Sequence, residues 1–221
     1  MIQFMNYKKL DIENWARKEH YRYYTEKLKI EINMTAPIDV KNLLDFCHAH
    51  NYKFYPTVIY IVSKVLNKIE NFKMFRDNEG NLCVWDKINP NYTIFHQDDR
   101  TFSDCWSKYE ENFEKCYQNI TADMQTYKDK KGIKVKEQQP ANFYCISCTP
   151  WTAFTGYGSR VANGEPAFFP IITMGKYEKT GDKIDMPINI TIAHAVADGY
   201  HIGLFFEYLQ NEINTFKNSD C

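Results

Sequence analysis

The chain has 221 residues, and its 27 lysines and arginines are balanced by 28 aspartates and glutamates, for a formal net charge of −1. Because binding to a phosphate backbone needs an excess of positive charge, nucleic acid is not an expected partner. A chain of this length can bury most of its apolar surface in one core, so we expect residues 1–221 to form a single domain.

The N-terminal half predicts helices joined by short extended segments. We expect helices over residues 11–24, 39–48 and 56–69, a half-buried strand over 30–34, and a hairpin over 72–85. Asp11 and Asp39 are candidate helix caps, and proline is favoured in a first helical turn, as at Pro56. The strand is predicted from alternating apolar residues, and the hairpin from the turn sequence that begins at Asn78.

The C-terminal half mixes both kinds of element. We expect a long polar helix over 103–127, an exposed loop over 128–139, strands over 142–147, 168–174 and 186–192, and a last helix over 201–216. The long helix is predicted from an apolar stripe that includes Trp106 and Phe113. Because strands and helices alternate without a regular repeat, the predicted class is α/β of the α+β type, a mixed β-sheet flanked by helices.

Targeting and membrane segments are not predicted. The N-terminus lacks a charged region followed by a continuous apolar stretch, so a secretory signal is not expected. The most apolar run, residues 54–66, contains Ser63 and Lys64 and is shorter than the roughly 20 residues of a bilayer span. We therefore expect a soluble, cytoplasmic protein that acts on small molecules and has no membrane partner.

The cysteines indicate reduced thiols. There are 7 of them, without the spacing of a disulfide framework, as is common in a cytosol. Cys145 and Cys148 are the one pair to consider as a redox or zinc site, but a second ligand pair at metal spacing is missing. We expect structural thiols and no metal.

The most informative stretch is His194-Ala195-Val196-Ala197-Asp198-Gly199, which follows an apolar run and precedes an amphipathic helix. A histidine at a strand end can act as a general base if its tautomer and ring orientation are fixed. An aspartate four residues later can brace the turn, and glycine allows the chain to bend sharply. A motif this short also occurs by chance, so its context decides its meaning.

That context is a series of further segments in the order of a known pattern. They are residues 14–21, 52–56, 92–96, 101–103, 147–151, 170–177 and 203–210. Together with the histidine motif they resemble the chloramphenicol acetyltransferase family over residues 5–214. The resemblance implies the two-layer sandwich fold of coenzyme A-dependent acyltransferases, and a homotrimer whose active sites lie between subunits.

The implied reaction moves acetyl from acetyl-coenzyme A to the primary hydroxyl of chloramphenicol within a ternary complex, which inactivates the antibiotic. By position in the motifs, His194 matches the general base and Ser147 matches a hydrogen-bond donor to the oxyanion. Thr173 matches a threonine that supports the same region through water. Asp198 matches an aspartate that pairs with the arginine at Arg17 and holds the turn, rather than a direct partner of the imidazole, which the resemblance implies is oriented mainly by backbone.

The resemblance also assigns binding residues. Those near the coenzyme are Lys53, Tyr55, Lys176 and Tyr177, and those of the aromatic acceptor pocket are Tyr24 and Phe102. For the lysines the alternative is a solvated surface position, and for the aromatic residues it is packing in the core.

The chain also departs from the family. Ala193, Ala197 and Tyr200 replace the family's common histidine, cysteine and phenylalanine, and residues 131–139 and 156–160 are more polar than the family's pocket segments. These departures put the acceptor in question. Two alternatives therefore stay open: a coenzyme A-dependent O-acyltransferase with a different hydroxylated acceptor, and a homologue that sequesters a ligand without turnover.

Overall fold

A computed structural model describes residues 6–159 and 164–217. Its centre is a twisted sheet that, in spatial order, contains β2 (Glu31–Asp39), β10 (Lys183–Ala193), β8 (Ile171–Gly175), β7 (Phe143–Thr149), β5 (Asn89–His96) and β6 (Thr101–Trp106). β9 (Glu178–Thr180) pairs with the start of β10. β7 runs parallel to both β5 and β8, whereas the other pairs are antiparallel. The predicted mixed sheet is therefore confirmed.

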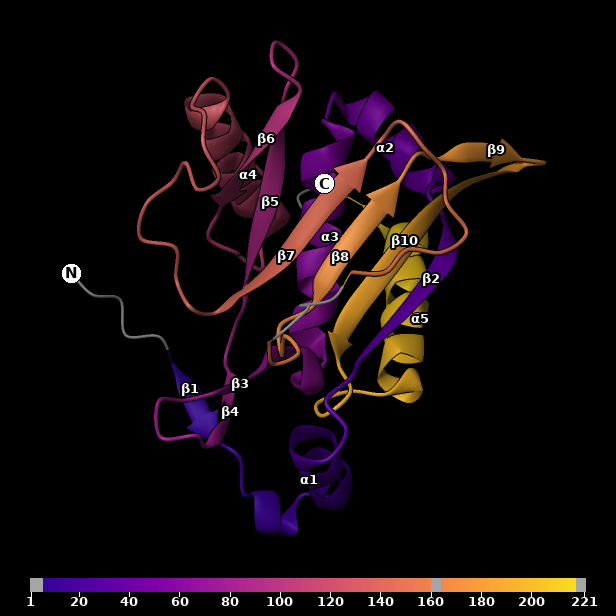
Figure 1. The fold of residues 1–221 in the computed structure, drawn as a ribbon. Coiled ribbons are helices and arrows are strands. Elements are labelled where there is room, and N and C mark those ends of the chain that lie inside the picture. The colour runs from indigo at the N-terminus through magenta and orange to yellow at the C-terminus, as the bar shows by residue number, and fades with distance from the viewer. Residues whose placement is uncertain (1–5, 160–163, 218–221) are drawn as a thin grey trace.

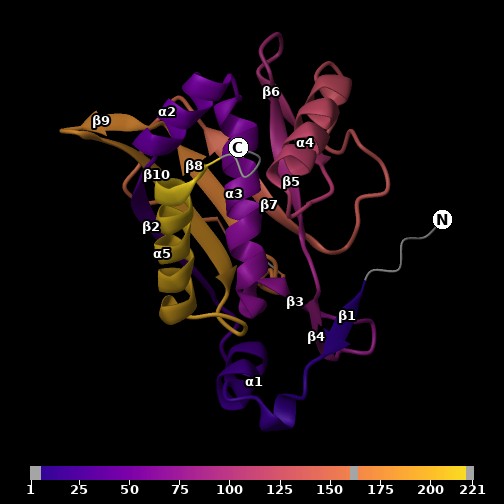
Figure 2. The same ribbon diagram turned by 180° about the vertical axis from the view of Figure 1, so that it is seen from behind.

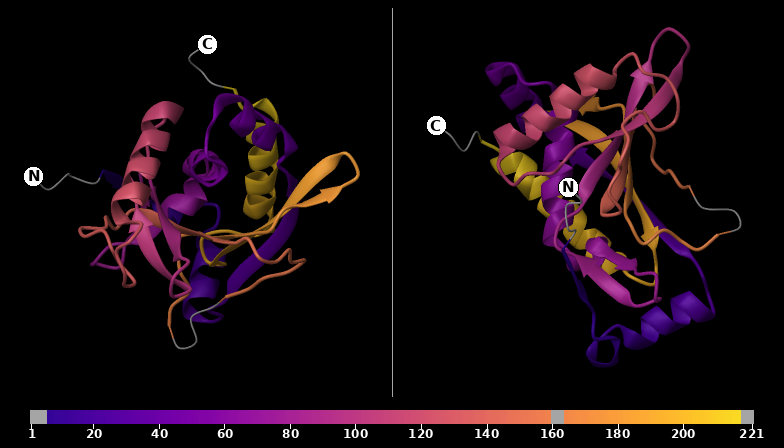
Figure 3. Two further views of the ribbon diagram at one scale, coloured as in Figure 1. Left: turned by 90° about the horizontal axis from the view of Figure 1, so that it is seen from above. Right: turned by 90° about the vertical axis from the view of Figure 1, so that its left-hand side faces the viewer.

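Helices cover one side of this sheet. They are α2 (Lys41–His50), α3 (Phe54–Lys68), α4 (Phe113–Tyr127) and α5 (Gly199–Thr215), which lie in front of the strands in Figure 2. Figure 1 views the other side, which is not covered by a helix of the described residues, and Figure 3 shows the same two layers from above. The short helix α1 (Lys18–Glu26) lies beyond the end of the sheet.

A smaller sheet stands apart from the main one. It pairs β1 (Tyr7–Lys9), β4 (Leu82–Trp85) and β3 (Met74–Arg76), and the 3-10 turns η1 (Ile12–Asn14) and η2 (Glu70–Lys73) connect it to the rest. β3 and β4 are the predicted hairpin, and Gly80 in its turn has a φ of +84°, which only glycine adopts freely.

The two sides of the large sheet differ in chemistry because successive residues of a strand point to opposite sides. Ile146, Ile172 and Ile190 are almost fully buried in the core under the helices. The positions between them carry Ser147, Thr173 and other polar residues. We call the helix-free side the open face of the sheet.

The predicted helix over 103–127 is wrong in its first part. Residues 101–106 form β6, and α4 begins at Phe113 after Asn112, whose side chain accepts a hydrogen bond of 3.0 Å from the backbone N–H of Lys115. β6 pairs with β5, a strand that we did not predict. Ser103 and Cys105 are buried on the helix side. The spacing of two between these buried residues indicates a strand, whereas the longer apolar stripe predicted a helix.

The predicted helix over 11–24 is also interrupted. Trp15 is extended (φ −81°, ψ 129°), so the chain forms the turn η1 and then α1 in place of one helix. Asp11 does not cap it, because its carboxylate accepts a hydrogen bond of 2.7 Å from the Asn14 side chain. The other predicted helices and strands are present with ends shifted by a few residues, and 128–139 is an irregular segment.

Gly175 ends β8 at a crowded position. A Cβ there would lie 2.7 Å from Pro187 Cγ and 2.8 Å from the ring of Phe154. Because overpacking usually costs about 1–3 kcal/mol, we expect Gly175→Ala to lower the free energy of unfolding by that amount in urea denaturation. Gly203→Ala in α5 is the control, since its Cβ would meet nothing within 4 Å and alanine favours a helix. Equal stability of both variants would contradict this packing argument.

Candidate active site

His194 directly follows the last residue of β10 and is held by main-chain groups. Its backbone N–H donates to the Ile30 carbonyl at 3.0 Å, and its Nδ1 lies 2.9 Å from the Ala197 carbonyl oxygen. Because a carbonyl can only accept, Nδ1 carries the proton and Nε2 is left with a free lone pair. The Tyr24 ring stacks on the imidazole with 3.9 Å between centroids. The geometry suits a neutral base of fixed orientation.

Asp198 caps α5 and does not contact the His194 ring. Its carboxylate accepts from the backbone N–H of Tyr200 at 3.0 Å and from His201 Nδ1 at 2.8 Å, and it forms an ion pair with Arg17. Arg17 also donates to the His194 carbonyl at 3.2 Å. The guanidinium therefore joins both ends of the turn, and α1 is fastened to the end of β10.

The environment keeps Asp198 ionised. Burial of the carboxylate favours its neutral form, but the hydrogen bond from His201 and the charge of Arg17 outweigh it and lower the pKa of Asp198 below its usual value. The side chains of Arg17 and Asp198 are only 12% and 32% exposed, so solvent screens the pair incompletely.

Ser147 and Thr173 are direct neighbours on the open face, in the register of β7 with β8. Thr173 pairs in turn with Asn189 on β10, five residues before His194. Two strand spacings and five residues along a strand separate Ser147 from His194 by about 19 Å within one chain. One chain therefore does not bring together the candidate base and the candidate oxyanion donor.

The four residues expected near the coenzyme all line one cavity of about 790 Å³ between α3, α4 and the ends of β7 and β8. They are Lys53, Tyr55, Lys176 and Tyr177. We call this the helix–sheet cavity. Within the described ranges neither lysine has a carboxylate partner, so both ammonium groups are available to a ligand. The lining of the helix–sheet cavity also includes the apolar side chains of Phe54 and Trp151, and Trp151 is 62% exposed.

The two tyrosines of the cavity differ in setting. Tyr55 is packed against the core and donates from its hydroxyl to the Thr93 carbonyl at 3.3 Å, and burial raises its pKa. It stays a neutral phenol at physiological pH. Tyr177 is more exposed, and its ring meets Phe54 edge-on with 5.8 Å between centroids.

The two candidate acceptor residues lie apart in the chain. Tyr24 belongs to α1 and stacks on His194, whereas Phe102 lies on β6 and is 50% exposed on the open face. α1 directly precedes β2 along the chain, and β2 and β6 are the opposite edges of the sheet, so the sheet separates the two residues. Like His194 and Ser147, they do not meet within one chain.

The expected orientation of the imidazole by backbone agrees with the contact to the Ala197 carbonyl, but sequence reasoning did not identify which carbonyl makes it. Every residue has a carbonyl, so the sequence holds no signal for this contact. Trp151 lines the helix–sheet cavity and could have been found, because it stands in the 147–151 segment that carries the family resemblance.

The remaining expectations concern thiols, metals and membranes. The six described cysteines are free, and burial raises the pKa of Cys145 and Cys148 to about 11, so both remain protonated thiols; Cys221 lies outside the described residues. The described part of the chain contains no cluster of metal-ligating side chains. In the same part, no helix is both long enough and apolar enough to cross a bilayer.

Comparison with known proteins identifies the family. Residues 5–210 match the family model for chloramphenicol acetyltransferase. A chloramphenicol acetyltransferase of Clostridium perfringens is 38% identical and covers 96% of this chain and 97% of its own length. Chloramphenicol acetyltransferase 3 of Escherichia coli is 35% identical over 96% of this chain and 99% of its own.

Solved structures agree with this in fold. A chloramphenicol acetyltransferase structure superposes with a TM-score of 0.79 at 22% identity, over 96% of this chain and 100% of that one. The cubic core of a pyruvate dehydrogenase complex gives 0.66 at 12% identity, over 96% and 92%. The fold is the expected α/β fold of acyltransferases, and the protein is an acyltransferase. The chain belongs to the chloramphenicol acetyltransferase family.

Replacing Arg17 with alanine would leave Asp198 without its cation and release the His194 carbonyl. We expect the free energy of unfolding at pH 7 to fall by about 3 kcal/mol in urea denaturation, because a poorly solvated ion pair loses one partner. Arg22→Ala on the same helix removes only an exposed pair with Glu13, which should cost less than about 1 kcal/mol. Similar losses in the two variants would refute the importance of the Arg17 contacts.

Proposed function

We propose that this protein transfers acetyl from acetyl-coenzyme A to the primary hydroxyl of chloramphenicol, with His194 as the general base in a ternary complex. The observation that carries the proposal is the orientation of His194. Its Nδ1 proton is committed to the Ala197 carbonyl, which leaves the Nε2 lone pair free for an incoming proton. The curated relatives bear the name of this activity.

The chemistry follows from these groups. Nε2 of His194 takes the hydroxyl proton as the alcohol oxygen bonds to the thioester carbon, and the carbonyl oxygen gains negative charge. The Ser147 hydroxyl donates to that oxyanion, with Thr173 supporting it through water; a donor of this kind is worth roughly 100- to 1,000-fold in rate. The intermediate then expels the thiolate, which recovers the proton from His194. Arg17 and Asp198 position the turn and take no proton.

The helix–sheet cavity is the proposed site of acetyl-coenzyme A, whose thioester is the acyl donor. Lys53 and Lys176 supply uncompensated positive charge for its phosphates, and the aromatic residues Phe54, Trp151 and Tyr177 supply apolar surface. Tyr92 pairs with Ile146 in a parallel register, so Thr93, which also lines the cavity, comes next to Ser147 on the open face. Residues 1–221 would act as one domain in the cytoplasm, where this co-substrate is available.

We further propose a homotrimer with active sites between subunits. The support is the separation of about 19 Å between His194 and Ser147 in one chain, which strand geometry imposes. An uncovered sheet face with polar rows also provides a surface on which a neighbouring copy can pack. In such an assembly, His194 and Tyr24 of one subunit would meet Ser147 and Phe102 of the next.

The activity is tested by thiol release. Purified protein with acetyl-coenzyme A should release free thiol when chloramphenicol is added, and His194→Ala should reduce that rate by about 100- to 10,000-fold, because the base is removed. His48→Ala, an exposed histidine of α2, is the matched control and should keep the full rate.

Other outcomes distinguish the alternatives. Thiol release with other alcohols but not with chloramphenicol would replace the acceptor and keep the reaction. Thermal stabilisation by chloramphenicol without any thiol release would indicate a ligand-sequestering homologue and overturn the enzymatic proposal.

The shared site is tested by mixing inactive chains. His194→Ala and Ser147→Ala proteins, unfolded and refolded together, should recover about a quarter of the wild-type sites, because random trimers pair an intact base with an intact serine at that frequency. Each variant refolded alone is the control. A mixture no more active than the mean of its parents would place both residues in the same subunit's site.

A further inference from the structure

The helix–sheet cavity has a third cation, which is not among the residues that the family resemblance assigns. Among the described residues that line this cavity, Lys53, Lys128 and Lys176 are basic and none is acidic. Lys128 is the C-cap residue of α4. Its ammonium lies 3.9 Å from the carboxylate of Asp129, a side chain that is 88% exposed. Solvent screens such a long surface contact strongly, so the ammonium of Lys128 is open to a ligand.

The three ammonium groups stand on two sides of the cavity. Lys53 and Lys176 are neighbours, because the aromatic rings of the residues that follow them in the chain meet with 5.8 Å between centroids. The backbone N–H of Lys53 donates to the Tyr117 hydroxyl of α4 at 2.9 Å. Lys128 follows Tyr117 by 11 residues, which places it about 16 Å further along the axis of α4. The pair and the single cation therefore face different parts of a ligand.

Strand register gives the direction of a ligand in this cavity. Thr93 lines the cavity and comes next to Ser147, the proposed oxyanion donor. His96 ends β5 three residues later, about 10 Å further along the strand, and it contacts the main chain of Lys128. The acyl group therefore belongs beside Thr93, and the charged part of the coenzyme belongs beyond it, toward Lys128.

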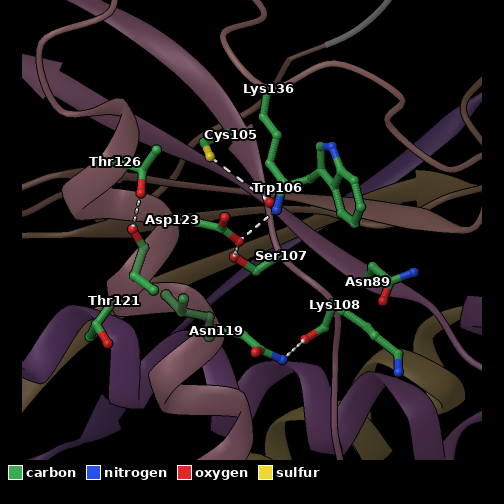
Figure 4. Close-up of polar contacts among 12 residues, drawn as sticks. Asn89, Cys105, Trp106, Ser107, Lys108, Asn119, Thr121, Asp123, Thr126 and Lys136 are labelled. Carbon is green, nitrogen blue, oxygen red and sulfur yellow. Dashed lines mark hydrogen bonds and ion pairs between the residues drawn. The ribbon is translucent and has the colours of Figure 1, made fainter.

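The end of α4 is held in place at two points. His96 is only 3% exposed, and its Nδ1 donates to the Lys128 carbonyl at 3.1 Å, because a carbonyl can only accept. Five residues earlier, Asp123 accepts from the Ser107 hydroxyl at 2.6 Å and from the Lys136 ammonium at 2.7 Å (Figure 4). The backbone of Lys128 is thus fixed, and only its side chain has to be ordered when an anion binds.

Helix polarity makes a cation important at this position. The C-terminal end of an α-helix carries partial negative charge, which disfavours a phosphate nearby. Two other lysines follow closely, but Lys130 faces the Tyr127 ring and Lys131 is paired with Asp98, and neither is among the described lining residues. Lys128 is therefore the residue whose full charge can make the α4 side of the cavity attractive to an anion.

We propose that Lys128 binds the pyrophosphate of acetyl-coenzyme A, as a third phosphate-binding residue of the helix–sheet cavity. The inference rests on the proposed function and deepens it. Coenzyme A carries a 3′-phosphate dianion, which suits the closely spaced Lys53 and Lys176. Its pyrophosphate lies between that group and the pantetheine arm. A single ammonium, which binds phosphate as a point charge, on the other side of the cavity matches this intermediate position.

The test removes the charge of Lys128 and, separately, the phosphates of the ligand. Calorimetric dissociation constants are measured for coenzyme A, for 3′-dephospho-coenzyme A, and for pantetheine, which has no phosphate. Lys128→Gln should weaken binding of the first two ligands about tenfold, because a charge-assisted contact is lost, and should leave pantetheine within about twofold. Lys128→Arg keeps the charge and should recover most of the loss.

Lys130→Gln is the matched control. It removes the same charge from the same end of α4 but outside the described cavity lining, so all three dissociation constants should stay unchanged. Thiol-release kinetics give a second readout: Lys128→Gln should raise the KM of acetyl-coenzyme A about tenfold with kcat unchanged, since the contact is equal in ground state and transition state.

The outcomes separate this inference from the proposed function. Absence of thiol release would refute the proposed function alone, because coenzyme A binding still reports on Lys128. A loss that disappears with 3′-dephospho-coenzyme A would assign Lys128 to the 3′-phosphate, and an equal loss with pantetheine would give it a structural role. Either result would overturn the inference, as would a loss for coenzyme A below about twofold or no binding of coenzyme A by the wild type.

Discussion

The alternation of side chains across the large sheet is the constraint on which the rest of this molecule depends. In β5, β7, β8 and β10, apolar residues point toward the helices and build one core. The intervening positions then necessarily form rows on the open face. Ser147 and Thr173 are polar members of these rows, so the same register that packs the core also arranges the candidate chemistry.

A second constraint is the rigid turn after β10. Three separate anchors hold it: the Ile30 and Ala197 carbonyls bind the histidine, and Arg17 joins the histidine carbonyl to Asp198. Asp198 thus caps α5 and, through Arg17, holds the backbone of the turn, while the Ala197 carbonyl orients the imidazole. This division explains how alanine at positions 193 and 197 is compatible with a fixed imidazole, since the contact at 197 uses a main-chain oxygen.

The acceptor side is where this chain differs from the pattern of its family. The helix–sheet cavity, the proposed coenzyme site, contains three lysines and several aromatic residues. The polar segment 131–139, in contrast, is tied to α4, because Lys136 pairs with Asp123 at 2.7 Å (Figure 4). Of the polar segment 156–160, Arg160 lies outside the described residues.

The sequence by itself determined the family, the mixed sheet, the hairpin and most helices, and it grouped four residues that the structure places around one cavity. These follow from local signals, namely apolar period, turn residues and motif order, which act over short stretches of chain. The prediction for residues 103–106 was wrong, because the apolar pattern of this strand, which pairing with β5 stabilises, is also that of the start of the following helix. The prediction also joined η1 to α1, because no local pattern indicates the extended conformation of Trp15. Only the tertiary structure decided that Ala197 orients the base, that Lys128 lines the same cavity as Lys53, and that His194 and Ser147 are far apart in one chain. Those facts depend on strand register and hydrogen bonds between distant segments, which no local pattern of residues specifies.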